Sequence, residues 1–281
     1  MKTAVHYRAL GENVPFEIGF PFLHECKAQG AELIMQTEGP LGLKTSAQEL
    51  RRIRQLAADC GLAISGLSNA ALWAFPLTSG DPGTRQRGID SLLCQIDAAV
   101  ELETQRLLVI PGYAGTTYVP SSETVRYDLA MARSADALAG VLPRARQAGV
   151  TLCVENVWNR MLLSPLELRS FVQALGSGAG IYFDVGNALL YGDPELWIEL
   201  LGSVIQAVHI KDALRSRADL SAYVPLGTGE IRFDEVFRAL DAINYDGYYT
   251  LEQHREFGPD VVRRELNALR CLRRKFDERR N

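Results

Sequence analysis

The sequence predicts an α/β fold, namely a (β/α)8 TIM barrel formed by a single domain that spans residues 1–281. Apolar runs of strand length alternate with longer segments of helical period, which is typical of repeated βα units around a parallel sheet. The chain carries eight such runs, and its 281 residues match the usual size of a barrel with eight βα units. These observations favour a closed barrel.

The expected strands are short apolar runs that begin close to the N-terminus and recur to the end of the chain. They are TAVHY near the start, AELIMQ from Ala31, AISGLS from Ala63, RLLVIPG from Arg106, VTLCVEN from Val150, GIYFDVGN from Gly180, QAVHIKD from Gln206 and YYTLEQH from Tyr248.

Three of the intervening segments predict helices, because apolar residues recur at i, i+3 and i+4 and a glycine lies near the C-terminal end. They are SAQELRRIRQLAADCG, TVRYDLAMARSADALAGVLPRARQAG and FDEVFRALDAINYDG. No linker rich in proline, glycine or serine marks a domain boundary, so we expect one domain. The alternative is an open doubly wound sheet. It would require a glycine-rich phosphate turn, and neither GxGxxG nor a Walker-type sequence occurs.

The composition predicts a small-molecule partner. A formal net charge of -4 provides no basic field for a nucleic acid backbone. No apolar run approaches the roughly 18 to 20 residues that a membrane span needs, and the first residues lack the long apolar segment of a signal peptide. We therefore expect a cytoplasmic protein that binds neither nucleic acid nor membrane. The five cysteines lie apart without CxxC spacing, which indicates packed side chains rather than a disulfide framework.

Four of the expected strands carry an ionisable residue near their C-terminal ends. Because side chains alternate between the two faces of a strand, Glu155, Asp184, His209 and Glu252 each lie opposite the larger apolar residues of their strands. That apolar face is expected to meet the outer helices, so the four polar side chains should point toward the barrel axis. The C-terminal end of the strands is where barrel enzymes build their sites.

Three carboxylates on one axis repel each other, and each costs several kcal/mol to bury without a partner, so the arrangement requires a cation. A divalent metal ion held by all four side chains meets this requirement. The alternative is a separate ion pair for each acid, for instance with Lys211 or Arg160, and a hydrogen-bonded core position for His209. That alternative would have to hold at four residues that lie at the same level along the barrel axis and on the inward face of their strands, so the metal site is favoured.

The order of the sequence strings around these residues is more specific than any one string. ENVWNRMLLSPLELRSFV, YFDVGNALLYGDPELWIELLG and VHIKDA surround the first three candidate ligands, and LGTGEIRFDEVF followed by YDGYYTLEQ leads to the fourth. This set resembles the xylose-isomerase-like superfamily of sugar and sugar-phosphate isomerases and epimerases. Upstream, LSNAALWAFPLTSGDPGTRQRGID and RLLVIPGY are similar to the third and fourth units of L-ribulose-5-phosphate 3-epimerases.

The resemblance implies that Glu155 and Glu252 are metal ligands that also act as acid and base, whereas Asp184 and His209 are ligands only. One imidazole and three carboxylates form a hard site that suits Mn²⁺ or Mg²⁺ and would tolerate Zn²⁺ or Co²⁺. The expected reaction is 3-epimerisation of a ketose or ketose phosphate. One glutamate removes the proton beside the carbonyl, and the other reprotonates the enediolate from the opposite face. Aldose–ketose isomerisation would need only one base.

Residues next to the expected ligands are candidate substrate contacts. Lys211 resembles the lysine of the family's HxKD motif, in which Asp212 would orient it; the alternative is an ion pair of Lys211 with Asp212 or Glu155. Asn187 stands where free-ketose epimerases such as D-tagatose 3-epimerase usually carry histidine. It would either hydrogen-bond a substrate hydroxyl or cap the strand end.

Two arginines and an asparagine in the following loops are further candidates. Arg215 lies six residues after His209, as does a substrate-binding arginine of ketose epimerases. Asn156 and Arg160 follow Glu155 into its loop and could reach substrate. The alternative for both arginines is a solvated surface charge.

Aromatic and histidine side chains complete the candidate site. Trp73 and Phe75 follow the third strand and could stack on the apolar face of a sugar, or pack beneath their loop. His254 lies on the same strand face as Glu252, and it is expected either to orient Glu252 or to line the mouth of the site. His6 has no evident partner, and we expect it to be structural or exposed.

Two other reactions of the superfamily are alternatives. The first is a lyase, such as an inosose dehydratase, in which the same metal ion and enediolate lead to loss of water. The second is a metal-dependent endonuclease, which uses three zinc ions and several more histidines; four histidines in an acidic chain argue against it. Relatives are often homodimers or homotetramers, so the chain is a candidate for either assembly.

Overall fold

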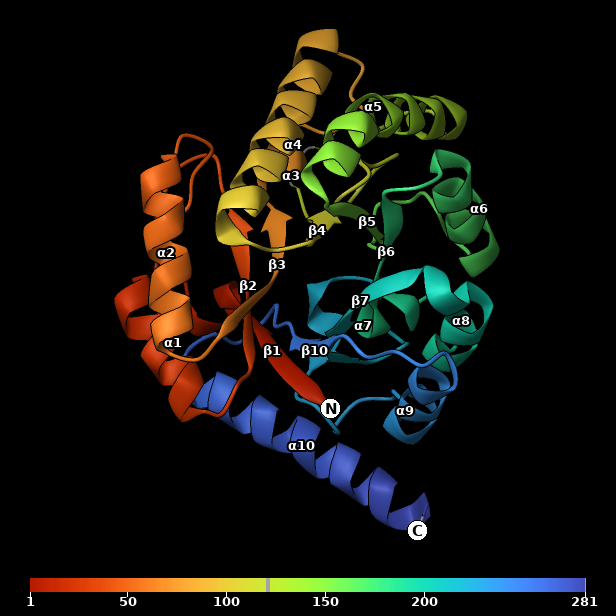
Figure 1. Cartoon of the computed structure of the whole chain (residues 1–281). Coiled ribbons are helices and arrows are strands. Elements are labelled where there is room, and N and C mark those ends of the chain that lie inside the picture. The colour runs from red at the N-terminus through yellow and green to blue at the C-terminus, as the bar shows by residue number, and fades with distance from the viewer. Residues whose placement is uncertain (120–121, 281) are drawn as a thin grey trace.

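The computed structural model describes residues 1–119 and 122–280, in which eight parallel strands close into a barrel (Figure 1). The predicted fold class is therefore confirmed. The barrel strands are β1 (Lys2–His6), β2 (Gly30–Met35), β3 (Ala63–Asn69), β4 (Arg106–Val109), β5 (Thr151–Glu155), β6 (Ala179–Asp184), β7 (Ile205–Ile210) and β10 (Tyr248–Leu251). They pair in chain order, and β10 closes the circle between β7 and β1.

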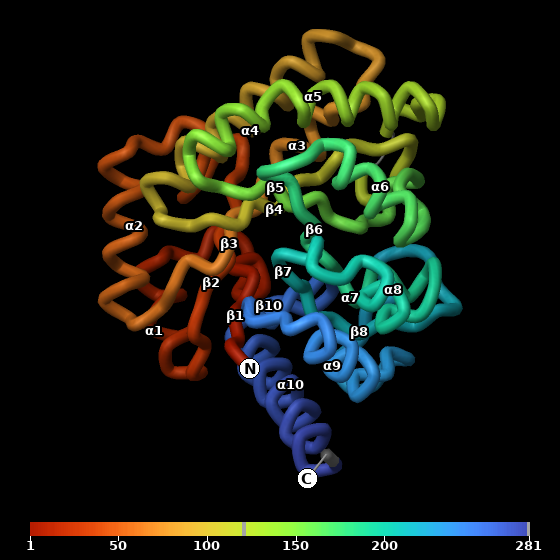
Figure 2. The backbone as a smooth tube through the Cα atoms, turned by 45° about the vertical axis from the view of Figure 1, so that its right-hand side comes forward, coloured from red at the N-terminus to blue at the C-terminus, as the bar shows by residue number. Residues whose placement is uncertain are grey.

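The helices surround the barrel, and consecutive large helices contact each other around its outside (Figure 1). They are α1 (Phe16–Glu25), α2 (Ala47–Asp59), α3 (Ala71–Ala74), α4 (Pro82–Leu102), α5 (Tyr127–Ala148), α6 (Pro165–Leu175), α7 (Val185–Ala188), α8 (Pro194–Leu201), α9 (Phe233–Ala242) and α10 (Pro259–Arg280), with short 3-10 turns η1 (Tyr7–Leu10), η2 (Gly202–Val204) and η3 (Leu220–Ala222). The last helix, α10, packs against α9 and η1; Figure 2 shows it beside α9. Within the described residues, no helix is both long enough and apolar enough to cross a membrane.

The three segments predicted as helices form α2, α5 and α9, and local signals account for their ends. Ser46 caps α2 by accepting a hydrogen bond from the Glu49 amide at 3.2 Å. Gly149 ends α5 with φ +70°, a left-handed conformation that glycine adopts without a steric penalty. Side-chain capping and glycine thus set these boundaries, as the sequence pattern indicates.

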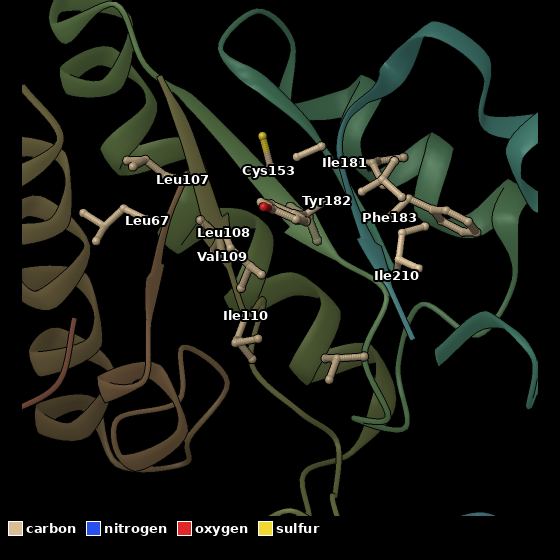
Figure 3. Packing of buried hydrophobic residues seen from close by; sticks show 14 of the residues in the cluster. Leu67, Leu107, Leu108, Val109, Ile110, Cys153, Ile181, Tyr182, Phe183 and Ile210 are labelled. Carbon is tan, nitrogen blue, oxygen red and sulfur yellow. The ribbon is translucent and has the colours of Figure 1, made fainter. Parts of the chain in front are cut away.

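Alternation along β6 separates the barrel interior from the helix layer. Figure 3 shows Tyr182 and Phe183 pointing to opposite sides of the strand. The ring of Phe183 packs outward against Trp197 of α8, with centroids 6.4 Å apart. Tyr182 crosses the interior, where its hydroxyl donates a hydrogen bond to Glu32 of β2. The predicted assignment of faces is therefore correct at β6, and Asp184 shares the inward face with Tyr182.

The segment after β6 differs from the predicted strand. GIYFDVGN was expected to be extended throughout, but β6 ends at Asp184 and the next four residues form the turn α7. The Asp184 side chain caps this turn, because its Oδ1 accepts a hydrogen bond from the Asn187 amide at 2.6 Å. A carboxylate at the strand end competes with further sheet pairing in this way.

A two-stranded antiparallel ribbon, β8 (Asp212–Ala213) and β9 (Tyr223–Val224), follows β7. The buried Asp212 carboxylate accepts hydrogen bonds from the backbone amides of Ala213, Gly227, Gly229 and Ile231. Asp212 thus anchors the loop after β7. Its carboxylate is occupied by these backbone amides, which corrects the expectation that Asp212 orients Lys211.

Candidate active site

The four predicted metal ligands converge at the C-terminal end of the barrel. Glu155 and Asp184 are the last residues of β5 and β6, His209 is the penultimate residue of β7, and Glu252 directly follows β10. The Glu252 amide donates to the Ile210 carbonyl at 3.2 Å, which holds it against β7. All four are buried, and one potential ligand atom from each lies within 4.8 Å of the others. The structure thus gathers side chains from four strands at one point.

The geometry around His209 fits a divalent cation. Its Nδ1 lies 3.3 Å from Glu252 Oε2, 3.5 Å from Glu155 Oε1 and 3.6 Å from Asp184 Oδ2. This buried nitrogen has no hydrogen-bond partner among the described residues. An unsatisfied buried acceptor costs about 1–3 kcal/mol, whereas a bound cation would satisfy it together with the carboxylates. One nitrogen and three oxygen donors suit Mn²⁺ or Mg²⁺.

Metal binding should therefore stabilise the fold. At a free Mn²⁺ concentration of 100 times Kd, we expect the free energy of unfolding to rise by about 2.7 kcal/mol, measured as an upward shift of Tm in thermal unfolding. Asp184→Asn should lose most of this shift, because the amide keeps the cap of α7 but removes a charged ligand. Asp246→Asn, at an exposed position, serves as the control. An unchanged Tm on adding Mn²⁺ to the native protein would count against the metal site.

Glu32 is a further member of the site that the sequence interpretation missed. This fully buried residue of β2 lies 2.8 Å from His209, Oε2 to Nε2, and also accepts the Tyr182 hydroxyl. A carboxylate beside Nε2 keeps the imidazole proton on that nitrogen, which leaves the Nδ1 lone pair free toward the other carboxylates. His6 lies behind, 3.9 Å from Glu32 and 3.1 Å from the hydroxyl of Ser68. His6 is therefore a buried part of the site and not an isolated side chain.

Lys211 joins the ligand group. Its buried Nζ lies 2.6 Å from Glu252 Oε2 and 2.8 Å from Asp184 Oδ2, and 4.6 Å from the ring centroid of Tyr223. The pairs of Lys211 with Asp212 or Glu155 that were considered from the sequence are not formed, but Lys211 does pair with two of the four candidate ligands, as the ion-pair alternative to the metal site expected. This one ammonium offsets part of the negative charge of the three carboxylates, on the side of the site where Asp184 and Glu252 meet, and among the described residues it makes no direct ion pair with Glu155.

The two glutamates have opposite electrostatic environments. Burial raises the pKa of Glu155 to about 7, and repulsion from Glu252 acts in the same direction. Burial also acts to raise the pKa of Glu252, but the positive charges of Lys211 and His209 outweigh it and hold that pKa well below its ordinary value. Two carboxylates whose pKa values are separated in this way are suited to different protonation states.

The two predicted asparagine contacts have well-defined partners. The Asn156 side chain accepts from the Asp184 amide at 2.7 Å and donates to the Asp184 carbonyl at 2.8 Å. Asn156 thus continues the pairing of β5 with β6 and fixes the backbone of a ligand. The Asn187 Nδ2 lies 3.5 Å from Glu155 Oε1, so Asn187 contacts a catalytic candidate directly.

A cavity of about 340 Å³ opens beside the ligand group. Among the residues that line it are Glu155, Glu252, Asn187, His254, Trp73 and Tyr118. His254 Nε2 lies 3.1 Å from Glu252 Oε2, and the ring of Trp73 packs edge-on against Tyr118 with centroids 5.2 Å apart. This volume is at the lower end for small-molecule pockets.

Three other candidates lie away from this cavity. Arg215 donates to the Leu189 carbonyl at 3.1 Å and pairs with Asp193 at 2.6 Å, so it braces the loop after β6. The Arg87 guanidinium carbon lies over Phe75, 4.6 Å from the centroid of the Phe75 ring. Arg160 is exposed. None of the three lines the cavity.

Comparison with known proteins agrees with this architecture. A family model for the xylose isomerase-like TIM barrel matches residues 20–272. The chain is 26% identical over 284 residues to a protein of Escherichia coli (strain K12) provisionally named L-ribulose-5-phosphate 3-epimerase SgbU, covering 99% of this chain and 97% of that protein.

Two solved structures share the fold across nearly the whole chain. An L-ribulose 3-epimerase matches with a TM-score of 0.79 at 20% identity, covering 99% of this chain and 97% of that one. A D-psicose 3-epimerase from Clostridium cellulolyticum H10 also gives 0.79, at 16% identity, covering 97% and 98%. Because the family model spans most of the sequence, the chain belongs to the xylose isomerase-like TIM barrel family.

Proposed function

We propose that this protein is a divalent-metal-dependent 3-epimerase of a ketose or ketose phosphate. The observation that carries the proposal is that Glu155 and Glu252 line the same cavity from strands that β6 and β7 separate in the barrel. Two carboxylates that reach one cavity from different directions can serve opposite faces of a bound carbon. Epimerisation requires two such groups, whereas aldose–ketose isomerisation needs only one base.

The residues of the site divide the work of this reaction. Glu155, Asp184, His209 and Glu252 would hold Mn²⁺ or Mg²⁺, which when bound acts as a Lewis acid toward a carbonyl and its neighbouring hydroxyl. One glutamate removes the proton from C3, and the other delivers a proton to the opposite face of the enediolate. The Lys211 ammonium, 2.6 Å from Glu252, stabilises the ionised form of that glutamate.

The cavity and the relatives support a small sugar as the substrate. The cavity volume of about 340 Å³ is at the lower end for small-molecule pockets. Trp73 and Tyr118 on its wall offer aromatic surface to the C–H groups of a sugar and restrict the entry of water. The E. coli relative is named for L-ribulose 5-phosphate, and the two structural neighbours are named as 3-epimerases of free ketoses.

Proton exchange followed by NMR tests the proposal. The Mn²⁺-loaded protein is incubated in D₂O with ketoses and ketose 5-phosphates, and the hydrogens beside each carbonyl are followed. We expect metal-dependent deuterium incorporation at C3 of one substrate, accompanied by its C3 epimer. Incorporation at C1 or C2 would instead indicate aldose–ketose isomerisation. Loss of water without epimer formation would indicate the lyase alternative.

A further inference from the structure

Asn187 is held at all of its polar groups. Its backbone amide donates to Asp184 Oδ1 at 2.6 Å, and its carbonyl accepts from Trp158 Nε1 at 3.0 Å. Its side-chain oxygen accepts from the Tyr223 hydroxyl at 2.5 Å, and its side-chain nitrogen lies 3.5 Å from Glu155 Oε1. A buried amide with a donor partner on its oxygen and an acceptor partner on its nitrogen has one preferred orientation.

Tyr223 and Glu155 together set which way that amide faces. A phenol has one proton, and an amide oxygen only accepts, so Tyr223 donates to Asn187 Oδ1. Tyr118, whose hydroxyl lies 2.8 Å from that of Tyr223, must then donate to Tyr223. If the Asn187 amide were flipped, its oxygen would face Glu155 Oε1, so two acceptors would oppose each other, and Tyr223 would have to accept from the NH₂ group and turn its proton to Tyr118. The Tyr223 donor on one side and the Glu155 acceptor on the other therefore direct the Asn187 NH₂ group toward Glu155.

The Tyr223 ring is itself firmly placed. It is buried and stacks on Trp158 and His254, with centroids 5.1 and 5.0 Å away, while the Lys211 Nζ lies 4.6 Å from its centroid. The ring is fixed by contacts on its faces that do not involve its hydroxyl. Removing the hydroxyl should therefore leave the ring in position.

The consequence falls on the Glu155 carboxylate. Its Oε1 lies 3.5 Å from the Asn187 amide nitrogen and 3.5 Å from His209 Nδ1, so this oxygen faces the ligand group. The other oxygen has no hydrogen bond within the described chain and belongs to a residue that lines the cavity. We infer that Tyr223, acting through Asn187, is a positioning residue that fixes the rotation of the Glu155 carboxylate so that Oε2 faces the substrate carbon. This inference rests on the proposed function.

Tyr223→Phe tests the inference because it removes one hydroxyl and keeps the ring. We expect kcat to fall about tenfold with KM nearly unchanged, since the hydroxyl acts on a catalytic group rather than on substrate binding. Tyr245→Phe is the matched control. It removes a half-buried hydroxyl whose one hydrogen bond, to the Tyr248 carbonyl at 2.8 Å, lies at the opposite end of the barrel.

A difference in deuterium exchange between the two starting epimers distinguishes a misplaced Glu155 carboxylate from a general loss of activity. In D₂O, starting from the epimer whose C3 hydrogen faces Glu252, Tyr223→Phe should form the enediolate normally but reprotonate it slowly from Glu155. The ratio of deuterium incorporated into the remaining starting epimer to product epimer formed should then be several times higher than in the native protein. Starting from the other epimer, deuterium incorporation at C3 of the remaining starting sugar should not exceed formation of the product epimer. Tyr118→Phe should lack this asymmetry, because Tyr223 keeps its own donor.

Crystal structures of the Mn²⁺-loaded variants give a readout that does not depend on turnover. The Asn187 amide should turn and lose its contact with Glu155 in Tyr223→Phe, but keep it in Tyr118→Phe. An unchanged Glu155 carboxylate in Tyr223→Phe, or equal slowing of both epimers without the exchange asymmetry, would overturn the inference. If the native protein exchanges no ketose hydrogen, the proposed function fails, and these structures still decide the inference.

Discussion

Replacing Glu155 or Glu252 with glutamine is expected to lower kcat by about 10²- to 10⁴-fold, because each variant lacks one of the two proton-transfer groups. Glutamine has nearly the same shape and keeps an oxygen that can face a metal ion, but it cannot accept and return a proton at this position. A similar loss in both variants follows from a reaction that uses each carboxylate once per turnover.

The pattern of exchange should distinguish the two variants from each other. Glu155→Gln should still allow Glu252 to exchange the C3 hydrogen of one epimer, and Glu252→Gln should allow Glu155 to exchange the hydrogen of the other, in both cases without conversion. NMR in D₂O with each epimer separately measures this. Glu199→Gln, at an exposed position on α8, is the control and should match the native rate. A near-normal rate in either catalytic variant would remove that glutamate from the mechanism.

The strands and their inward faces were predictable because the relevant forces are local. Alternation along a strand separates apolar from polar faces, and a parallel barrel turns one face toward the axis. Glu155 and Asp184 therefore occupy the predicted positions at the ends of β5 and β6. The predicted strand around Asp184 was too long, because side-chain capping at this residue is a competing local interaction that alternation does not reveal.

Contacts made by loops were less accessible from the sequence. Arg215 has the sequence spacing of a substrate contact, yet Asp193 and the Leu189 carbonyl hold it over a neighbouring loop. Tyr223 and Tyr118 join two loops over the site, and no sequence pattern connects them. Loop conformation depends on hydrogen bonds between distant segments, such as those that Asp212 accepts, and not on periodicity.

Glu32 and His6 are different, because the sequence did carry a signal for them. Both are ionisable residues inside apolar strands, and both lie on the face that points inward, as the four ligands do. Alternation along the last four barrel strands places the four ligands inward. Applied to the first two strands, it would have placed Glu32 and His6 in the barrel interior, although not their contacts with His209 and Ser68.

Glu32→Gln should weaken Mn²⁺ binding by about 10- to 100-fold, the usual effect of removing a carboxylate that supports a metal-ligating histidine. Glu32 Oε2 receives both the Tyr182 hydroxyl and His209 Nε2, and a glutamine oxygen at that place can still accept both hydrogen bonds. What glutamine removes is the negative charge that polarises the imidazole and makes Nδ1 a better donor to a cation.

Titration calorimetry with Mn²⁺ alone measures this effect, and kinetics at saturating Mn²⁺ separates it from a role in catalysis. We expect kcat to recover to near the native value once Mn²⁺ saturates the variant, because Glu32 lies behind His209 and does not line the cavity. Glu265→Gln provides a matched buried carboxylate on α10, which accepts a hydrogen bond from the Leu226 amide and is not a member of the ligand group, and it should leave the Kd for Mn²⁺ unchanged. An unchanged Kd in Glu32→Gln would mean that hydrogen-bond geometry alone, without the carboxylate charge, prepares His209 for the metal ion.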